Sequence, residues 1–140
     1  AGVTHLESYD FIDVTPAGVF VSDEAGEVEG TPLPQWRGNV SVGYTDGPVR
    51  LSWYANYVGP MEIDNAAPAG TYQPGFDRIP SLWLHNLYAQ YTFDEQISVR
   101  GGVMNVFDTE PPSNPYTFSG AGGLYDNNGR YFWFGISFNN

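Results

Sequence analysis

Apolar and polar residues alternate along five segments of the chain, which is the pattern of β-strands with one apolar face. A weaker sixth segment lies near residues 3–12, where Glu7, Asp10 and Asp13 interrupt the alternation. The apolar positions of the five clear segments are Val40, Val42 and Tyr44 in 37–45; Leu51, Trp53, Ala55 and Tyr57 in 50–57; Trp83, Leu87, Ala89, Tyr91 and Phe93 in 81–93; Ile97, Val99, Gly101 and Val103 in 97–104; and Phe132, Phe134, Ile136 and Phe138 in 130–138. No amphipathic helix with capping residues is found. The sequence therefore predicts an all-β fold of about six antiparallel strands.

The connections between these segments alternate between long and short. Long connections are expected at about 14–35, 59–80 and 107–128, and tight turns at Asp46-Gly47-Pro48 and Asp94-Glu95-Gln96. All long connections then lie at one end of the sheet and all tight turns at the other. Transmembrane β-barrels have this asymmetry, with strands of about 10 residues. A soluble meander does not need it.

Charges and aromatic residues follow the same division. All the acidic residues except the three in the weak first segment fall in loops, turns or the residues beside them. Each strand has an aromatic residue near at least one end, where the two aromatic girdles of a barrel lie. These residues are Tyr44, Tyr57, Trp83, Tyr91, Phe93 and Phe138. The alternative is a soluble β-sandwich with the apolar face as its core, acting as a carbohydrate-binding module whose Tyr and Trp side chains stack on sugars.

Length and charge restrict the possible functions further. The 140 residues suffice for one structural unit, 1–140. The 16 acidic residues outnumber the 5 basic ones, giving a net charge of −11 that disfavours nucleic acid as a partner. No stretch reaches the roughly 20 apolar residues of a membrane-spanning helix. The chain begins at Ala1 without an initiator Met or a signal peptide, so it is either a processed protein or a piece of a longer one, and we expect a piece.

Short motifs at the ends of the predicted strands resemble those of the C-terminal strands of TonB-dependent outer-membrane receptors. The resemblance covers residues from about 33 to the C-terminus, and the motifs occur in the order of the family. They are Leu33-Pro34-Gln35-Trp36-Arg37-Gly38-Asn39, Asn56-Tyr57-Val58-Gly59, Arg78-Ile79-Pro80-Ser81, Asn105-Val106-Phe107-Asp108 with Pro111-Pro112, and Tyr125-Asp126 with Gly129-Arg130.

The resemblance implies that the chain forms the last six strands of a 22-stranded barrel in the outer membrane of a Gram-negative bacterium, without the plug domain. The full-length parent would import a ferric siderophore, cobalamin or an oligosaccharide. Implied partners are outer-membrane lipid, the barrel assembly machinery and, through the missing plug, the TonB energy-coupling protein. The assembly signal of the last strand is matched at Gly135, Ile136 and Phe138, whereas the chain ends in Asn139-Asn140 where the family usually has an aromatic residue.

Catalysis and metal binding find little support in the sequence. There is no Gly-x-Ser-x-Gly motif, no Cys and no His pair at metal-ligand spacing, so we expect no enzyme, no bound metal and no cofactor. The acidic segments 23–29 and 126–129 do not match the spacing of an EF-hand loop, and solvated loops are the simpler reading. Ligand contacts are expected from aromatic and charged residues of the long connections. These are Tyr72, Phe76, Asp77, Arg78, Tyr116, Phe118, Tyr125 and Asp126.

Overall fold

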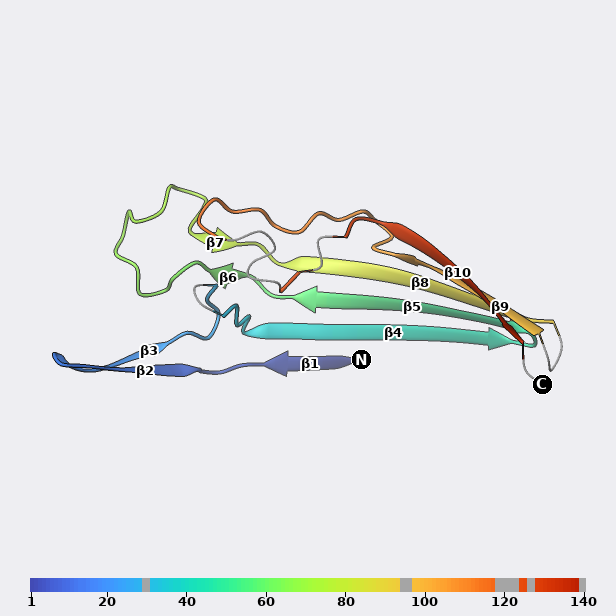
Figure 1. The fold of residues 1–140 in the computed structure, drawn as a ribbon, viewed down its shortest axis with the longest axis horizontal. Coiled ribbons are helices and arrows are strands. Elements are labelled where there is room, and N and C mark those ends of the chain that lie inside the picture. Colours follow the sequence, from blue (N-terminus) through green and yellow to red (C-terminus); the bar gives the residue numbers. More distant parts are fainter. Residues whose placement is uncertain (29–30, 94–96, 118–123, 126–127, 139–140) are drawn as a thin grey trace.

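The computed structural model is an all-β molecule built around one curved antiparallel sheet (Figure 1). It describes residues 1–28, 31–93, 97–117, 124–125 and 128–138. The sheet has six strands in the order β1-β4-β5-β8-β9-β10. Its strands are β1 (Gly2–His5), β4 (Trp36–Asp46), β5 (Val49–Val58), β8 (Leu82–Thr92), β9 (Ile97–Met104) and β10 (Tyr131–Phe138). Two small two-stranded sheets accompany it, formed by β2 (Asp10–Thr15) with β3 (Gly18–Asp23) and by β6 (Met61–Glu62) with β7 (Arg78–Ile79).

Five of the predicted strands are confirmed, together with the faces assigned to them. Residues directly opposite each other in an antiparallel sheet share a face. One such row crosses the sheet through Val42, Trp53, Leu87, Val103 and Phe132, and all five were predicted on the apolar face. The β4–β5 turn lies at the opposite end from the long connections, as expected (Figure 1). The second predicted turn, at 94–96, lies outside the described residues.

The weak first segment differs from the prediction. Instead of one strand over 3–12, the chain forms β1, loses its partner after the His5–Trp36 pair, and regains one only at Asp10, opposite Asp23. Residues 6–9 belong to no strand, although single backbone hydrogen bonds still join Leu6 to Gln35 at 2.8 Å and Glu24 to Tyr9 at 2.8 Å. The predicted connection 14–35 was also wrong in part, since it contains the strand β3.

The hairpin of β2 and β3 projects beyond the six-stranded sheet at the end where the long connections gather (Figure 1). Asp23 closes its base, where one carboxylate oxygen accepts hydrogen bonds from the backbone N–H groups of Tyr9 at 2.8 Å and of Ala25 at 3.0 Å. The bond from Tyr9, and then the bond from Ala25, lower the pKa of Asp23 below its ordinary value because they stabilise the charged form.

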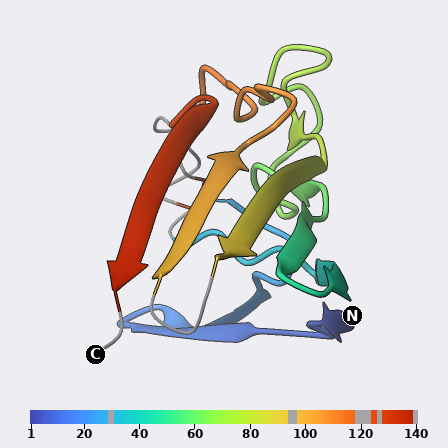
Figure 2. The same cartoon turned by 90° about the vertical axis from the view of Figure 1, so that its right-hand side faces the viewer.

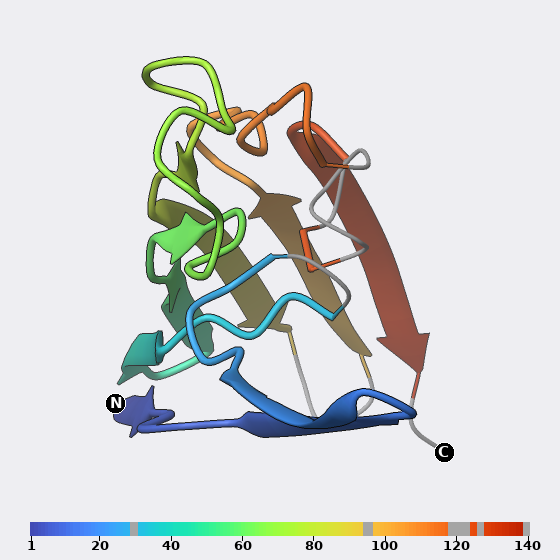
Figure 3. The same cartoon turned by 90° about the vertical axis from the view of Figure 1, so that its left-hand side faces the viewer.

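The sheet is curved, and the long connections lie on its concave side (Figures 2 and 3). The buried core is found there and not along the middle of the strands. Val28, Met61, Ile63, Ile79, Leu82 and Tyr125 form this cluster. Leu82 belongs to β8 and shares its face with Leu84, which packs against the cluster. The concave side is therefore the face that carries the polar residues predicted for the strands.

The apolar face is the convex one, and most of its large side chains are exposed. Val42 is 57% exposed, Phe132 73% and Phe134 71%, whereas the alternating positions of β8 on the concave face are partly buried. A soluble sandwich would show the reverse, with apolar residues inside. The sandwich alternative is thus wrong, and the sheet has the distribution of a barrel wall in lipid.

Two aromatic groups lie toward the two ends of this convex face. At the end with the long connections, the rings of Tyr57 and Trp83 are 4.8 Å apart. At the end with the tight turn, Tyr91 and Phe93 are also separated by 4.8 Å. This is the arrangement expected for aromatic girdles at two membrane–water interfaces.

The Gly101-Gly102 pair in β9 lets a neighbouring side chain lie flat against the sheet. Gly102 is opposite Trp133 on the concave face. A Cβ at Gly102 would lie 2.6 Å from the indole Nε1 of Trp133 and 2.9 Å from the carbonyl oxygen of Leu87. The indole therefore occupies the space that any other residue would fill.

Replacing Gly102 with alanine is expected to destabilise the sheet by about 1–3 kcal/mol, the range for an overpacked site. The indole can move, but the backbone oxygen of Leu87 cannot turn away. Gly43→Ala is the matched control, because Gly43 lies in the same cross-strand row and its Cβ would meet nothing nearer than 4.0 Å. Equal losses in the free energy of unfolding for the two variants of the full-length parent, measured by urea titration in lipid vesicles, would contradict this account.

Candidate ligand-binding loops

The motifs at the strand ends hold the bases of the long connections together in pairs. The N–H of Gly59 donates a 2.8 Å hydrogen bond to the carbonyl of Trp36. A Cβ at Gly59 would lie 3.0 Å from the same carbonyl oxygen and 3.1 Å from the Cβ of Trp36. Glycine therefore allows the close approach of the chain leaving β5 to the start of β4. Two of the motifs named above thus meet at one strand boundary.

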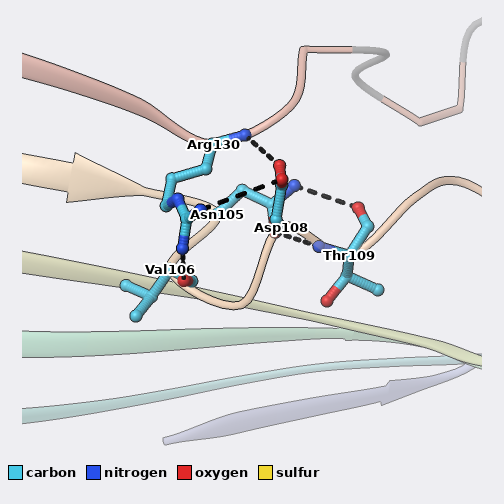
Figure 4. Close-up of polar contacts among 5 residues, drawn as sticks. All are labelled: Asn105, Val106, Asp108, Thr109 and Arg130. Atoms are coloured by element: carbon cyan, nitrogen blue, oxygen red, sulfur yellow. Dashed lines mark hydrogen bonds and ion pairs between the residues drawn. The ribbon is translucent and has the colours of Figure 1, made fainter.

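A second pair forms where β9 ends and β10 begins (Figure 4). The side chain of Asn105 bonds Thr109 twice, since its Nδ2 donates to the carbonyl of Thr109 at 3.0 Å and its Oδ1 accepts from the N–H at 2.9 Å. Asp108 accepts a 2.7 Å hydrogen bond from the N–H of Arg130. The guanidinium of Arg130 donates to the carbonyl of Val106 at 3.4 Å. The two bonds of Arg130 join the two ends of the third long connection.

Asn105 and Asp108 both have positive φ angles, of 50° and 55°. Asn and Asp adopt this left-handed conformation more easily than other residues that carry a side chain. The hydrogen bonds of Asn105 hold the turn in this shape, and the residue is buried. The motif therefore acts as a strand terminator.

Above these bases, the second and third long connections contact each other through aromatic rings. The rings of Tyr72 and Tyr116 are 5.0 Å apart in an edge-to-face arrangement. The N–H of Gln73 donates to the hydroxyl of Tyr116 at 3.4 Å, and Asn114 donates to the carbonyl of Phe76 at 3.0 Å. The structure thus brings together Tyr72, Phe76 and Tyr116, three of the residues proposed from the sequence.

Asp77 and Arg78 lie beside this cluster, at the second strand of the small β6–β7 pair. Arg78 makes an ion pair of 3.4 Å with Glu62 and one of 3.8 Å with Asp77. Both pairs are exposed, so solvent screens them and they add little stability. The side chains of Asp77 and Arg78 are therefore largely exposed beside the aromatic residues of the loops.

Tyr125 occupies a different position from the other candidates. It is 5% exposed and belongs to the buried cluster, so its ring packs against the connections. Burial raises the pKa of its hydroxyl, an effect that the nearby charge of Arg37 partly opposes. The remaining two candidates, Phe118 and Asp126, lie outside the described residues.

The sequence did not reveal two polar residues, Asn114 and Glu27, that organise these connections. Asn114 is buried and its Oδ1 accepts the N–H of Tyr116 at 2.9 Å. Glu27 is buried too, and its carboxylate accepts the N–H of Asn65 at 3.0 Å across 38 positions of sequence. A loop Asn before Pro, as in Asn114-Pro115, is a turn signal that could have identified the first. No local sequence pattern indicates a long-range hydrogen bond such as the one between Glu27 and Asn65.

Other kinds of site are not indicated by the part of the chain that the structure describes. Within it, no group of three or more His, Asp or Glu side chains is placed to hold a metal ion. The same residues contain no helix that is long and apolar enough to cross a membrane.

Comparison with known proteins gives the chain its family. A family model described as "TonB dependent receptor-like, beta-barrel" matches residues 2–106. This match begins earlier in the chain than the motifs of the sequence analysis, which start at Leu33, and it ends within the motif that begins at Asn105. No curated protein sequence matches. The ferric-catecholate import receptor Fiu of E. coli K12, in its closed form, is similar in structure with a TM-score of 0.55 and 16% identity, covering 94% of this chain but only 20% of that one. The family match over most of the residues and the shared fold agree with the exposed apolar residues on the convex face of the sheet. The chain belongs to the TonB-dependent receptor β-barrel family.

Proposed function

We propose that the chain forms part of the barrel wall of an outer-membrane receptor whose full-length parent imports a scarce solute. The exposed convex face carries this proposal, because large apolar residues on the outside of a curved sheet suit lipid and not water. Membership of a receptor family supports transport, and an enzyme activity has no support.

We further propose that the solute contacts the connected loops at the open end of the sheet. Tyr72, Phe76 and Tyr116 offer aromatic surface, and Asp77 and Arg78 offer charge beside it. A ferric siderophore is favoured over cobalamin or an oligosaccharide, since aromatic rings and a guanidinium suit a chelate with aromatic donors and negative charge. The structurally similar protein Fiu is a ferric-catecholate import receptor, which points in the same direction.

The remaining partners follow from this role. Lipid would cover the convex face, and the barrel assembly machinery would recognise the last strand through Gly135, Ile136 and Phe138. Ile136 and Phe138 are exposed on the convex face, where a membrane protein of the assembly machinery would meet them. The TonB protein would couple energy through a plug that these residues do not include.

Tyr72→Ala and Tyr116→Ala, introduced singly into the full-length parent, are each expected to weaken solute binding about ten-fold, the loss typical of a tyrosine at the centre of an interface. Each removes one ring of the pair and part of the stacking surface. The measurement is the Kd for a ferric catecholate, a ferric hydroxamate, cobalamin and a maltooligosaccharide, by fluorescence quenching in detergent.

Tyr44→Ala is the control, because Tyr44 is an exposed tyrosine at the tight-turn end of the sheet. It should leave every Kd unchanged. If none of the four solutes binds the parent, or if the two loop variants bind like the control, the proposed contacts are wrong. Tight binding of cobalamin or the oligosaccharide alone would overturn the siderophore assignment and leave the receptor role intact.

A further inference from the structure

The β2–β3 hairpin presents an exposed apolar face beyond the six-stranded sheet (Figure 1). Two directly opposite pairs, Ile12–Val21 and Val14–Val19, lie next to each other on one face of the hairpin. We call these four side chains the aliphatic face, and each of them is between 59% and 75% exposed. Because a two-stranded sheet is only marginally stable in water until a further element packs on its apolar face, this surface suits a partner.

One end of the aliphatic face carries two carboxylates. Asp10 lies directly opposite Asp23, on the same face as the Ile12–Val21 pair and two residues, or roughly 7 Å, away from it. Both side chains belong to exposed residues. In such a pair the Cβ atoms are about 5 Å apart, and like charges at this position destabilise a hairpin. A cation placed between the two carboxylates would relieve this repulsion.

The segment around the hairpin is acidic in sequence. Residues 6–36 contain seven acidic residues and no Lys, Arg or His. The acidic residues are Glu7, Asp10, Asp13, Asp23, Glu24, Glu27 and Glu29. A negative segment of this kind attracts positively charged partners and repels negatively charged ones. The charge therefore selects a basic partner for the aliphatic face.

Hydrogen bonds at both ends hold the hairpin in one shape and position. At its tip, the N–H of Ala17 donates to the Oγ1 of Thr15 at 3.2 Å, and that hydroxyl donates to the carbonyl of Gly18 at 3.2 Å. At its base, the Nδ2 of Asn65 donates to the carbonyl of Asp23 at 2.9 Å, which ties the hairpin to the second long connection. A surface that is ordered before binding loses little conformational entropy when a partner docks.

We propose that the aliphatic face docks a basic, amphipathic segment of a partner protein outside the cell. Apolar side chains of that segment cover the aliphatic face, and a Lys or Arg side chain binds between Asp10 and Asp23. A neighbouring strand of the parent barrel is a poorer occupant, because it would pair with an edge of the hairpin and leave this face uncovered. Lipid is poorer too, since hydrocarbon would not stabilise the two carboxylates. The inference rests on the proposed function, in which the hairpin lies on the external side of the membrane.

Cysteine labelling of the full-length parent, freed of any other cysteine, tests this inference. Val19→Cys should react readily with a water-soluble maleimide in the parent alone, because the face is open. The probe is a synthetic peptide of two arginines followed by alternating threonine and valine. At about ten times its Kd, this peptide should slow the labelling about ten-fold. Phe20→Cys is the matched control, because Phe20 is 57% exposed on the opposite face and its labelling should be unaffected by the peptide.

Charge variants give a second readout on the same peptide. Asp10→Asn should weaken its binding about two- to five-fold, the loss expected for an exposed ion pair. Asp13→Asn is the control, since Asp13 lies opposite Phe20 on the other face, and it should change the Kd less. A peptide with two glutamates in place of the arginines should bind more weakly than the arginine peptide does to either variant.

Three outcomes would overturn the docking role. Slow labelling of Val19→Cys in the parent alone would mean that another part of the parent, or a second copy of it, covers the face. Labelling that is fast in detergent but slow in lipid nanodiscs would assign the face to lipid. Labelling that the arginine peptide does not slow, or equal affinity for the two peptides, would mean that the face binds no basic segment. A parent that binds the peptide as expected, but imports no solute in a separate uptake assay, would keep the docking surface and refute the proposed function.

Discussion

Val42→Asp or Phe134→Asp in the full-length parent is expected to reduce the stability of the inserted barrel by up to about 2 kcal/mol, because Asp on the lipid face costs less than Arg or Lys, which cost about 2–4 kcal/mol at the midplane. Both side chains point outward from the convex face, and each lies within its strand and away from the aromatic groups at the two ends. A carboxylate there would lose its hydration in hydrocarbon. The measurement is the free energy of folding into lipid vesicles from urea titrations.

Ser41→Asp is the control for this pair. Ser41 adjoins Val42 in β4 and so points to the concave face, in the same row as Tyr54 and Asn86. A carboxylate there would remain in a polar interior, and the expected change is less than about 1 kcal/mol. If Ser41→Asp proves as harmful as Val42→Asp, the two faces have been assigned wrongly and the concave side is not the interior.

Most of the sheet could be predicted because the alternation itself is a physical requirement of the fold. A strand with lipid on one side and a polar interior on the other must alternate, and one misplaced residue would put a polar group in hydrocarbon. The segments that became β4, β5, β8, β9 and β10 satisfy this over most of their length, with Leu82 and Leu84 at the start of β8 as exceptions that pack in the buried cluster. The first segment does not, because β2 leaves the six-stranded sheet and pairs only with β3.

The strand β3 could not be predicted from alternation, for a related reason. In the hairpin, Ile12 lies opposite Val21 and Phe11 opposite Ser22, so both faces carry apolar residues and no alternation marks either strand. Thr15-Pro16-Ala17-Gly18 was the available signal. Pro and Gly punctuate turns, and Gly18 has a φ of 143° that favours glycine. The turn was visible in the sequence, but its assignment to a hairpin was not made.

The candidate ligand site was predictable in composition but not in arrangement. Aromatic and charged residues in long loops are a general sign of recognition, and Tyr72 and Tyr116 were proposed on that basis. Their contact depends on Asn114 and on the buried cluster, which join residues far apart in sequence. For the same reason, nothing in the sequence separated Tyr125, which packs in the cluster, from the exposed tyrosines.

Ile79→Ala is expected to reduce the stability of the buried cluster by about 2–5 kcal/mol, the range for truncating a fully buried aliphatic side chain. Ile79 is 0% exposed and pairs with Met61, so its loss leaves a cavity where the connections meet the sheet. Because the cluster lies at one end of the concave face, the loops should open locally while the barrel stays inserted. The reporters are the backbone amides of Val28 and Ile63, which donate to the carbonyls of Glu62 at 3.0 Å and Asp77 at 2.9 Å.

In that variant, the exchange of these two amides should accelerate, while amides in the middle of β8 should keep their rates. Ile12→Ala is the matched control, because Ile12 is 59% exposed in the projecting hairpin and its truncation leaves no cavity. Faster exchange throughout β8 would contradict a local cluster and make Ile79 part of the stability of the whole sheet. If the local opening occurs, solute affinity should fall with it, since Tyr72 packs against this cluster and the cluster holds the connections that carry the proposed contacts.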